Sequence, residues 1–165
     1  AAVKQLDANG NGAIDPDELD ACPGLKAAAG EIDANGDKKL TADELQARFA
    51  RYGDGAAGGG RTAVGVKVTV DGAPAADVTV RFEPEAFMGA GLKPATGTTD
   101  GTGFASLKAD GAADFGIPAG VYRIVATRAG KDLPAKYNTK TTLGREVFDG
   151  ARASSGSVDL RLKSN

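Results

Sequence analysis

Apolar and polar residues alternate along much of the second part of the chain. Residues 64–70 have valine at every second position, and residues 78–82 repeat the pattern with valine and phenylalanine. Because successive side chains of a β-strand point to opposite faces, each run predicts a strand with one buried face. Asp71 and Gly72 are typical turn residues between the two runs. The Asp71 side chain, like that of Asp100 in a later turn, is expected to bond its local backbone.

Further short strands are expected toward the C-terminus, each bounded by glycine, proline or aspartate. They are predicted at residues 96–99, 104–107, 121–127, 146–148 and 157–162. Short strands separated by turn signals are typical of an all-β sandwich, and about 100 residues suffice for a domain with its own core. Residues 83–95 and 130–144 fit no strand, so each is expected either to cover a sheet edge or to form a ligand surface.

The first 52 residues follow a different pattern, in which short helical segments flank two loops rich in Asp, Asn and Gly. Only six residues precede the first loop, and the breakers at 20–24 are expected to end one short helix before residues 25–32 form the next. Six apolar residues are expected to form a small core that belongs to this segment alone. They are Leu6, Leu19, Leu25, Ile32, Leu45 and Phe49.

Oxygen-bearing side chains recur at fixed positions in loop 1, residues 7–18. They stand at loop positions 1, 3, 5, 9 and 12, with Gly12 at position 6. A loop with this spacing supplies the oxygen ligands of a Ca²⁺ ion, and glycine at position 6 permits the sharp turn around the ion. The candidate metal ligands are the side chains of Asp7, Asn9, Asn11, Asp15 and Glu18 and the backbone carbonyl of Ala13.

Loop 2, residues 33–44, repeats this pattern. Its candidate metal ligands are the side chains of Asp33, Asn35, Asp37, Thr41 and Glu44 and the backbone carbonyl of Lys39. Lys38 stands at position 6, where the turn favours glycine. A residue other than glycine in the left-handed region costs about 1–2 kcal/mol. Loop 2 is therefore expected to bind calcium more weakly than loop 1.

The last residues of each loop predict the start of a helix. Asp15 with Glu18, and Thr41 with Glu44, have the spacing of a capping box, in which side chains satisfy the first backbone N–H groups of a helix. Pro16 stands where a first helical residue would lie, a position that proline favours.

The apolar residues at position 8 of the loops, Ile14 and Leu40, are placed for a short strand contact that would pair the loops back to back. With this pairing, residues 1–52 resemble an EF-hand pair. The loops start only 26 residues apart, at Asp7 and Asp33, which is similar to the abbreviated EF-hand pairs of secreted bacterial proteins. The resemblance implies two Ca²⁺ sites.

Net charge divides the chain at the same place as the pattern. Residues 1–52 carry six basic and ten acidic side chains, a net of −4, whereas residues 61–165 carry fourteen and eleven, a net of +3. We therefore expect two domains, 1–52 and 62–165, joined by a glycine-rich linker at 53–61. The predicted fold class is α+β and multi-domain, a small helical EF-hand pair followed by an all-β sandwich.

Composition disfavours several function classes. The chain has no run of Lys and Arg that would mark a nucleic-acid surface, and no apolar stretch near the ~20 residues of a membrane span. It has no histidine and a single cysteine, which argues against zinc chemistry and a disulfide framework. That residue, Cys22, is expected to be a small apolar residue in the hinge between the loops, with an intermolecular disulfide as the alternative.

The second part of the chain carries the turn and core residues of a known family. The residues concerned are Gly65, Val66, Asp71, Gly72, Pro74, Val78, Val80, Phe82, residues 98–100, Gly103, Phe104, residues 117–120 and Tyr122. In this order, residues 62–163 resemble the carboxypeptidase regulatory-like, transthyretin-like (prealbumin-like) β-sandwich. They are also similar to secreted lipoprotein-like sandwiches of planctomycete bacteria. The resemblance implies a fold and says little about activity.

A catalytic role is not expected for the sandwich. Its carboxylates outside obvious turns are Glu83, Glu85, Asp110 and Asp114, and their spacing does not suggest a catalytic pair. They are expected to be solvated loop charges, and the chain is predicted not to be an enzyme.

The leading hypothesis is an exported calcium-binding protein with a structural or adhesive role, located outside the cell, on the cell surface or in the periplasm. Calcium would stabilise the N-terminal module against the sandwich, and copies of the chain would associate through open sheet edges into a filament or surface layer. One alternative is a calcium-dependent binding module for a peptide, a glycan or a protein partner. Another is an accessory domain of a secreted enzyme.

Overall fold

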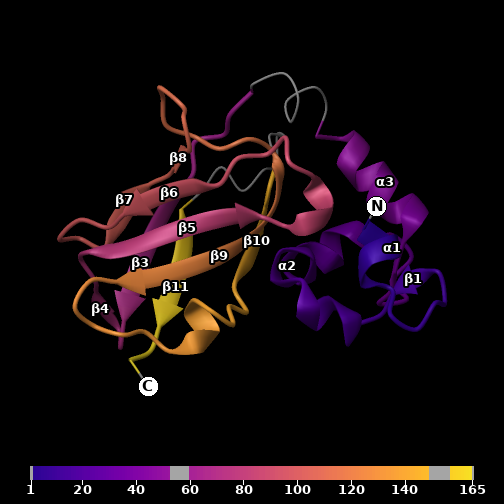
Figure 1. The fold of residues 1–165 in the computed structure, drawn as a ribbon, viewed down its shortest axis with the longest axis horizontal. Helices are drawn as coiled ribbons and strands as arrows, with labels where there is room; N and C mark the ends of the chain where they lie inside the picture. The colour runs from indigo at the N-terminus through magenta and orange to yellow at the C-terminus, as the bar shows by residue number, and fades with distance from the viewer. Residues whose placement is uncertain (1, 53–59, 149–156, 165) are drawn as a thin grey trace.

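The structure is a computed structural model that describes residues 2–52, 60–148 and 157–164. It is an α+β fold with a helical part at the N-terminus and two larger β-sheets after it (Figure 1). The helical part consists of α1 (Ala2–Leu6), β1 (Ala13–Ile14), the 3₁₀ turn η1 (Glu18–Ala21), α2 (Pro23–Ile32), β2 (Leu40–Thr41) and α3 (Ala42–Ala50).

The β part is built from two sheets. The order of the first is β10 (Gly144–Val147), β9 (Gly120–Arg128), β5 (Val78–Pro84), β6 (Ala95–Thr98) and β8 (Lys108–Ala109). The order of the second is β11 (Val158–Leu162), β3 (Gly65–Val70) and β4 (Ala73–Pro74), and β7 (Phe104–Ser106) also pairs with β3. Neighbouring strands are antiparallel throughout the described residues, except that β11 runs parallel to β3.

One apolar core lies between the two sheets. Val66 and Val68 of β3 share a cluster with Val80 and Phe82 of β5 and with Ile124 of β9. Burial alternates along β3 and β5, as the period of two in the sequence predicts. The predicted strands and their arrangement as a β-sandwich are confirmed, and the transthyretin-like type stays a prediction.

Most of residues 83–95 and 130–144 lies outside the strands, as predicted. These two segments contain the short turns η2 (Ala86–Met88) and η3 (Ala135–Tyr137). Leu92, Leu133 and Tyr137 from these segments are buried in the core between the sheets. These apolar side chains therefore help to fill the core, and the two predicted roles of the segments, covering a sheet edge or forming a ligand surface, stay predictions.

The helical part shares its core with the sandwich, so the expectation of a separate core was wrong. Leu25 and Ile32 of α2 lie in one cluster with Ala119 and Val121 of the sandwich. Short helices with few apolar residues bury too little surface to fold alone, and a distant strand supplies the missing surface. Further sandwich residues that pack against this cluster are Phe87, Met88 and Phe148.

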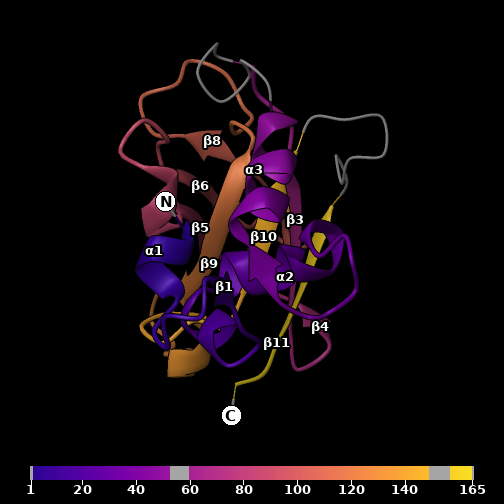
Figure 2. The same cartoon turned by 90° about the vertical axis from the view of Figure 1, so that its right-hand side faces the viewer.

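The backbone of α2 lies directly against the sandwich, beside β9 and β10 (Figures 1 and 2). A Cβ atom added at Gly144 of β10 would lie 2.2 Å from the backbone carbonyl carbon and oxygen of Pro23. One added at Gly24 would lie 2.7 Å from the backbone oxygen of Tyr122. Both distances are too short for a real Cβ atom, so only glycine permits the helix and the sheet to approach this closely.

One of the two turn aspartates differs from expectation. Asp100 accepts hydrogen bonds from the N–H groups of Thr102 and Phe104 at 2.8 and 3.1 Å, which confirms the predicted local bonding. Asp71 instead accepts from the N–H of Ser164 at 3.1 Å, so the local prediction was wrong there. The reason is that β11 ends beside this turn, where the Asp71 N–H also donates to the carbonyl of Leu162 at 3.0 Å.

The predicted linker at 53–61 lies largely outside the described residues, which resume at residue 60. From there the chain joins the β part at once, because Thr62 and Ile117 exchange backbone hydrogen bonds of 2.9 and 3.0 Å. The division into two domains at this linker stays a prediction. Among the described helices, none is long and apolar enough to cross a membrane.

Two glycines of α2 form a matched pair for testing the contact with the sandwich. Gly24→Ala should destabilise the protein by about 1–3 kcal/mol, because the added methyl group meets the backbone oxygen of Tyr122 as well as two side-chain atoms. Gly30→Ala should stabilise it by about 0.5–1 kcal/mol, since a Cβ at Gly30 meets nothing within 4 Å and alanine favours a helix. Urea denaturation measures both free energies. A Gly24→Ala variant as stable as Gly30→Ala would contradict the close packing.

Candidate metal centre

Asp7 organises the first half of loop 1 through backbone hydrogen bonds. Its Oδ1 accepts from the N–H groups of Gly10 and Asn11 at 2.7 and 3.1 Å, and its Oδ2 accepts from Gly12 at 2.9 Å. Gly12 has a φ of +88°, the left-handed conformation predicted for position 6. The loop therefore turns where the sequence places its glycine.

The side chains of Asn9 and Asn11 meet at the Asp15 carboxylate. Its Oδ2 accepts from the amide nitrogens of Asn9 and Asn11 at 2.8 and 2.5 Å. Its Oδ1 lies 2.8 Å from the Lys39 ammonium of loop 2. These partners, led by Lys39, lower the pKa of Asp15 to about 2. Three of the predicted ligands, at positions 3, 5 and 9, are thus in contact with one another.

Glu18 joins the two halves of loop 1, because its carboxylate accepts hydrogen bonds from backbone N–H groups in both halves of the loop. Its Oε1 accepts from Ala8 and Asn9 at 2.8 and 3.1 Å, and its Oε2 accepts from Asp15 at 2.9 Å. The last bond is half of the predicted capping box. The other half is missing, because the Glu18 N–H donates to the Asp15 carbonyl instead of its side chain.

The prediction that a helix begins at Pro16 is therefore wrong. A 3₁₀ turn, η1, begins at Glu18 and ends at Ala21, and Pro16 lies before it. The Asp15 carboxylate contacts Lys39, Asn9 and Asn11 and accepts no hydrogen bond from the Glu18 N–H, so it does not cap a helix here.

Loop 2 repeats the hydrogen bonds of loop 1 around Asp33. Its carboxylate oxygens accept from the N–H groups of Gly36 and Lys38 at 2.7 and 2.8 Å. The amide nitrogen of Asn35 donates to Asp37 at 3.1 Å. Lys38 has a φ of +67°, so the lysine at position 6 adopts the conformation that favours glycine, as predicted.

The predicted capping box of loop 2 is confirmed at the start of α3. The hydroxyl of Thr41 accepts from the N–H of Glu44 at 3.3 Å, and Oε2 of Glu44 accepts from the N–H of Thr41 at 2.9 Å. The bond from the Thr41 N–H, together with one of 2.8 Å that the Thr41 hydroxyl donates to Oε2, lowers the pKa of Glu44. The residue predicted at position 12 of loop 2 is thus built into the first turn of α3.

The predicted strand contact between the loops is also confirmed. β1 and β2 pair antiparallel, with Ile14 opposite Leu40 and Ala13 opposite Thr41. The Ile14 and Leu40 side chains are fully buried, at 0% exposure. The two loops therefore lie back to back on a fixed ladder.

The oxygen donors suit Ca²⁺ by type, although the acidic groups do not gather. The predicted ligands are carboxylates, amides, a hydroxyl and backbone carbonyls, the donors that this hard cation prefers. In the described part of the chain, no three His, Cys, Asp or Glu side chains form a group that could hold a metal ion. Each loop mixes acids with neutral oxygens, and Asp15 holds a cation in the form of the Lys39 ammonium. The residues fit Ca²⁺, and their role as ligands stays a prediction.

A buried ion pair joins the helix after loop 2 to the sandwich. Arg48 of α3 donates two hydrogen bonds of 2.7 Å to the carboxylate of Glu146 on β10, and the Tyr52 hydroxyl donates a third at 2.8 Å. The Arg48 and Glu146 side chains are only 11% and 9% exposed. Sequence reasoning missed this cluster because the partners are 98 residues apart and no local pattern marks them.

A buried carboxylate joins the start of α2 to the sandwich. Glu85 accepts a hydrogen bond from the Gly24 N–H at 2.8 Å, and burial raises its pKa. Burial and the nearby Glu85 also raise the pKa of Cys22 to about 12, so the thiol stays protonated and unreactive. Cys22 is buried in the apolar cluster of the helical part, which agrees with the predicted small apolar residue in the hinge between the loops.

Two other sandwich carboxylates lie in ion pairs with arginine. Glu83 lies 2.7 Å from Arg123, and Asp110 lies 3.0 Å from Arg81. Each is partly exposed. Asp110 is an exposed loop charge, as expected. Glu83 lies in strand β5 and Glu85 is buried, so the expected role as solvated loop charges was wrong for these two residues.

Comparison with known families supports the assignment of loop 1. A family model described as EF hand matches residues 3–22, which span α1, loop 1 and η1. A search of curated proteins gives no match to this chain. The match of residues 3–22 to the EF-hand model suggests calcium binding at loop 1.

Strain at Lys38 gives a testable consequence. Lys38→Gly should stabilise the protein by about 1 kcal/mol, because glycine adopts a positive φ without steric cost. Lys38→Gln keeps the strain and removes the same charge, so it serves as the control and should leave stability within about 0.5 kcal/mol. Thermal denaturation in EDTA measures both. Equal stabilisation by the two substitutions would attribute the effect to charge and contradict the role of backbone strain.

Burial of Glu85 predicts a pH dependence. Because its pKa is raised in the folded protein, its contribution to stability is greatest below its ordinary pKa of 4.5 and is lost as the pH rises through the folded-state value. Glu85→Gln keeps the acceptor for Gly24 and removes the charge. Its stability relative to the natural chain should therefore increase from pH 4 to pH 7.

Urea denaturation in EDTA across this pH range measures the difference. Glu83→Gln is the matched control, because Glu83 is ion-paired with Arg123 at the surface and its replacement should give no such gain. A Glu85→Gln variant whose relative stability does not change with pH would contradict the burial argument.

Proposed function

We propose that this chain is a non-enzymatic calcium-binding protein in which the two loops fix the helical part against the β-sandwich. The observation that carries the proposal is the Arg48–Glu146 ion pair, which joins α3 to β10. Bound Ca²⁺ would neutralise the loop carboxylates and hold their oxygens together. Loops ordered in this way would then stabilise the contact between the helical part and the β-sandwich.

Loop 2 reaches the sandwich through α3. Glu44, its predicted last ligand, lies in the first turn of this helix, and Arg48 lies one turn further along. A Glu44 carboxylate held in loop 2 would fix the first turn of α3. The nearly buried Arg48 and Tyr52 then keep their geometry at Glu146.

Loop 1 reaches the sandwich through η1 and α2. Glu18 begins η1, and Cys22 directly precedes α2, which starts at Pro23. Pro23 and Gly24 form the close backbone contact with β9 and β10. A loop 1 fixed at Glu18 would therefore restrain the start of α2.

We further propose that the protein is exported and has a structural or adhesive role. Outside the cell calcium is near ~1 mM, so even sites with a Kd of ~10⁻⁴ M would be largely filled. Each would add about 1.4 kcal/mol to stability. The ion-paired Glu83 and Asp110 support a non-enzymatic sandwich. Assembly through sheet edges into a filament or surface layer, and a role as accessory domain of a secreted enzyme, remain predictions of the sequence.

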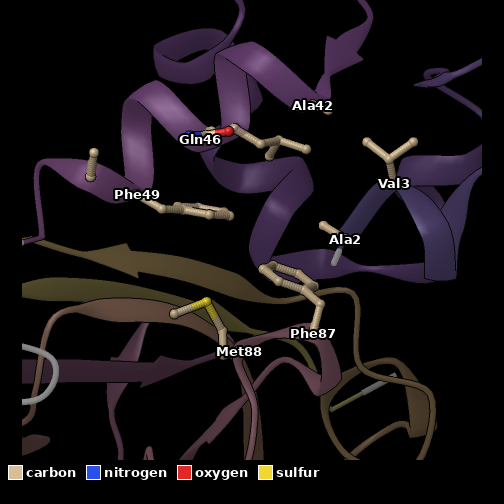
Figure 3. Close-up of a pocket in the computed structure, with 9 residues that line it drawn as sticks. Ala2, Val3, Ala42, Gln46, Phe49, Phe87 and Met88 are labelled. Carbon is tan, nitrogen blue, oxygen red and sulfur yellow. The ribbon is translucent and has the colours of Figure 1, made fainter.

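A second candidate function is calcium-dependent binding of a partner, and a cavity favours it. The cavity has a volume of about 500 Å³ and lies between α1, α3 and η2 (Figure 3). Phe49 and Phe87 stack across it with ring centroids 5.8 Å apart, and Met88 lies beside them. Its wall includes η2, from the segment predicted as a possible ligand surface. Because α3 begins at loop 2, calcium would influence the shape of this cavity.

The structural role predicts that calcium stabilises the whole protein through its loops. At 1 mM Ca²⁺ the melting temperature should be higher than in EDTA, and EDTA should speed proteolysis within residues 1–52. Glu18→Gln should lose much of the calcium-induced gain, because it weakens the predicted last ligand of loop 1. Calorimetry with and without calcium measures the effect.

Asp17→Asn is the matched control for Glu18→Gln. Asp17 is an exposed acid next to Glu18 and is not a predicted ligand, so its replacement removes the same charge and should keep the calcium-induced gain. If EDTA left melting and proteolysis of the natural chain unchanged, the structural calcium role would be wrong.

A further inference from the structure

Lys39 connects the two loops through its side chain. Its backbone carbonyl is a predicted ligand of loop 2, yet its ammonium lies 2.8 Å from Oδ1 of Asp15, a predicted ligand of loop 1. The Lys39 side chain is 47% exposed and that of Asp15 is 14% exposed, so the carboxylate is less accessible to solvent than the lysine side chain that contacts it.

The paired strands between the loops fix this contact. Lys39 precedes Leu40 and Asp15 follows Ile14, and these two apolar residues face each other in the antiparallel ladder. The register therefore brings the start of β2 beside the end of β1. Since Ile14 and Leu40 are fully buried, the proximity of Lys39 to Asp15 is set by the fold and not by a chance approach of a surface side chain.

The contact engages an oxygen that loop 1 is predicted to need. Oδ1 of Asp15 pairs with Lys39, and Oδ2 accepts from the amide nitrogens of Asn9 and Asn11. The negative charge of a carboxylate oxygen is partly neutralised by an ammonium group at hydrogen-bond distance. A second cation at the same carboxylate has to compete with it.

We propose that the Lys39 ammonium is an internal competitor of Ca²⁺ at loop 1. It has to leave Asp15 before this carboxylate can serve fully as a ligand, so a side chain of loop 2 lowers the calcium affinity of loop 1. The inference rests on the proposed calcium function. It identifies Lys39 as the residue that tunes loop 1, in addition to its predicted carbonyl role in loop 2.

Lys38 supplies a matched control for Lys39. It is the preceding residue and has the same charge, and no ion pair joins it to another group in the described part of the chain. Lys38→Gln and Lys39→Gln therefore change the net charge equally. Lys39→Arg keeps the positive charge that faces Asp15.

Calcium titration followed by NMR tests the proposal. The Gly12 amide reports on loop 1, because it donates to Asp7, and the Gly36 amide reports on loop 2, because it donates to Asp33. Lys39→Gln should raise the affinity read at Gly12 by about two- to five-fold, the range that an exposed ion pair accounts for. Lys38→Gln should raise it less than about 1.5-fold, and Lys39→Arg should leave it near the natural value.

The possible outcomes separate this proposal from the calcium function itself. Equal affinities at Gly12 for Lys38→Gln and Lys39→Gln would overturn the competitor role while leaving calcium binding intact. If neither the natural chain nor Lys39→Gln responds to calcium at Gly12, the proposed function of loop 1 fails, and the competitor role with it. A response in Lys39→Gln alone would support the competitor role and show that the natural loop 1 is held closed to calcium.

Discussion

The backbone contact of α2 with β9 and β10 sets the position of the whole helical part. Gly24 and Gly144 permit this approach, and Glu85 receives the Gly24 N–H at its centre. Both loops are attached to this helix, since loop 1 and η1 precede it and loop 2 begins at its C-terminal cap, Asp33. Anchoring one helix therefore anchors the near ends of both candidate calcium sites. A side chain in place of either glycine would move the helix away from the sheet and disturb both loops together.

The shared core makes the helical part and the sandwich depend on each other. Leu25 packs in one cluster with Val121 of β9, and Arg48 pairs with Glu146 of β10 at the far end of α3. Arg48 and Glu146 lose most of their contact with water at this interface. Each of the two side chains therefore stabilises the fold only while its partner stays in place. Calcium binding to the loops would therefore also stabilise the sandwich. By thermodynamic linkage, the folding of the sandwich would influence the calcium affinity of the loops. The helical part, whose first helix is very short, gains from the sandwich the apolar surface that it lacks.

Local patterns could be predicted from the sequence, and contacts between distant segments could not. The strands, the positive φ of Lys38 and the pairing of Ile14 with Leu40 each depend on neighbouring residues or on a fixed spacing. The Arg48–Glu146 pair joins residues 98 apart, and the shared core also joins distant segments, so no periodicity connects the partners. The absent helix at Pro16 has a related cause. Its predicted cap, Asp15, is engaged by Lys39 from the other loop, and tertiary contact overrides the local signal.

Hydrogen exchange with and without calcium tests the central claim most directly, because it resolves the two parts of the chain. The Ile124 N–H of β9 donates to the Leu143 carbonyl at 2.8 Å inside the sandwich, far along the sequence from either loop. If calcium in the loops stabilises a single interdependent structure, exchange should slow on calcium addition both within residues 2–52 and at Ile124. Slower exchange confined to residues 2–52, with Ile124 unchanged, would contradict the claim that the loops act on the sandwich.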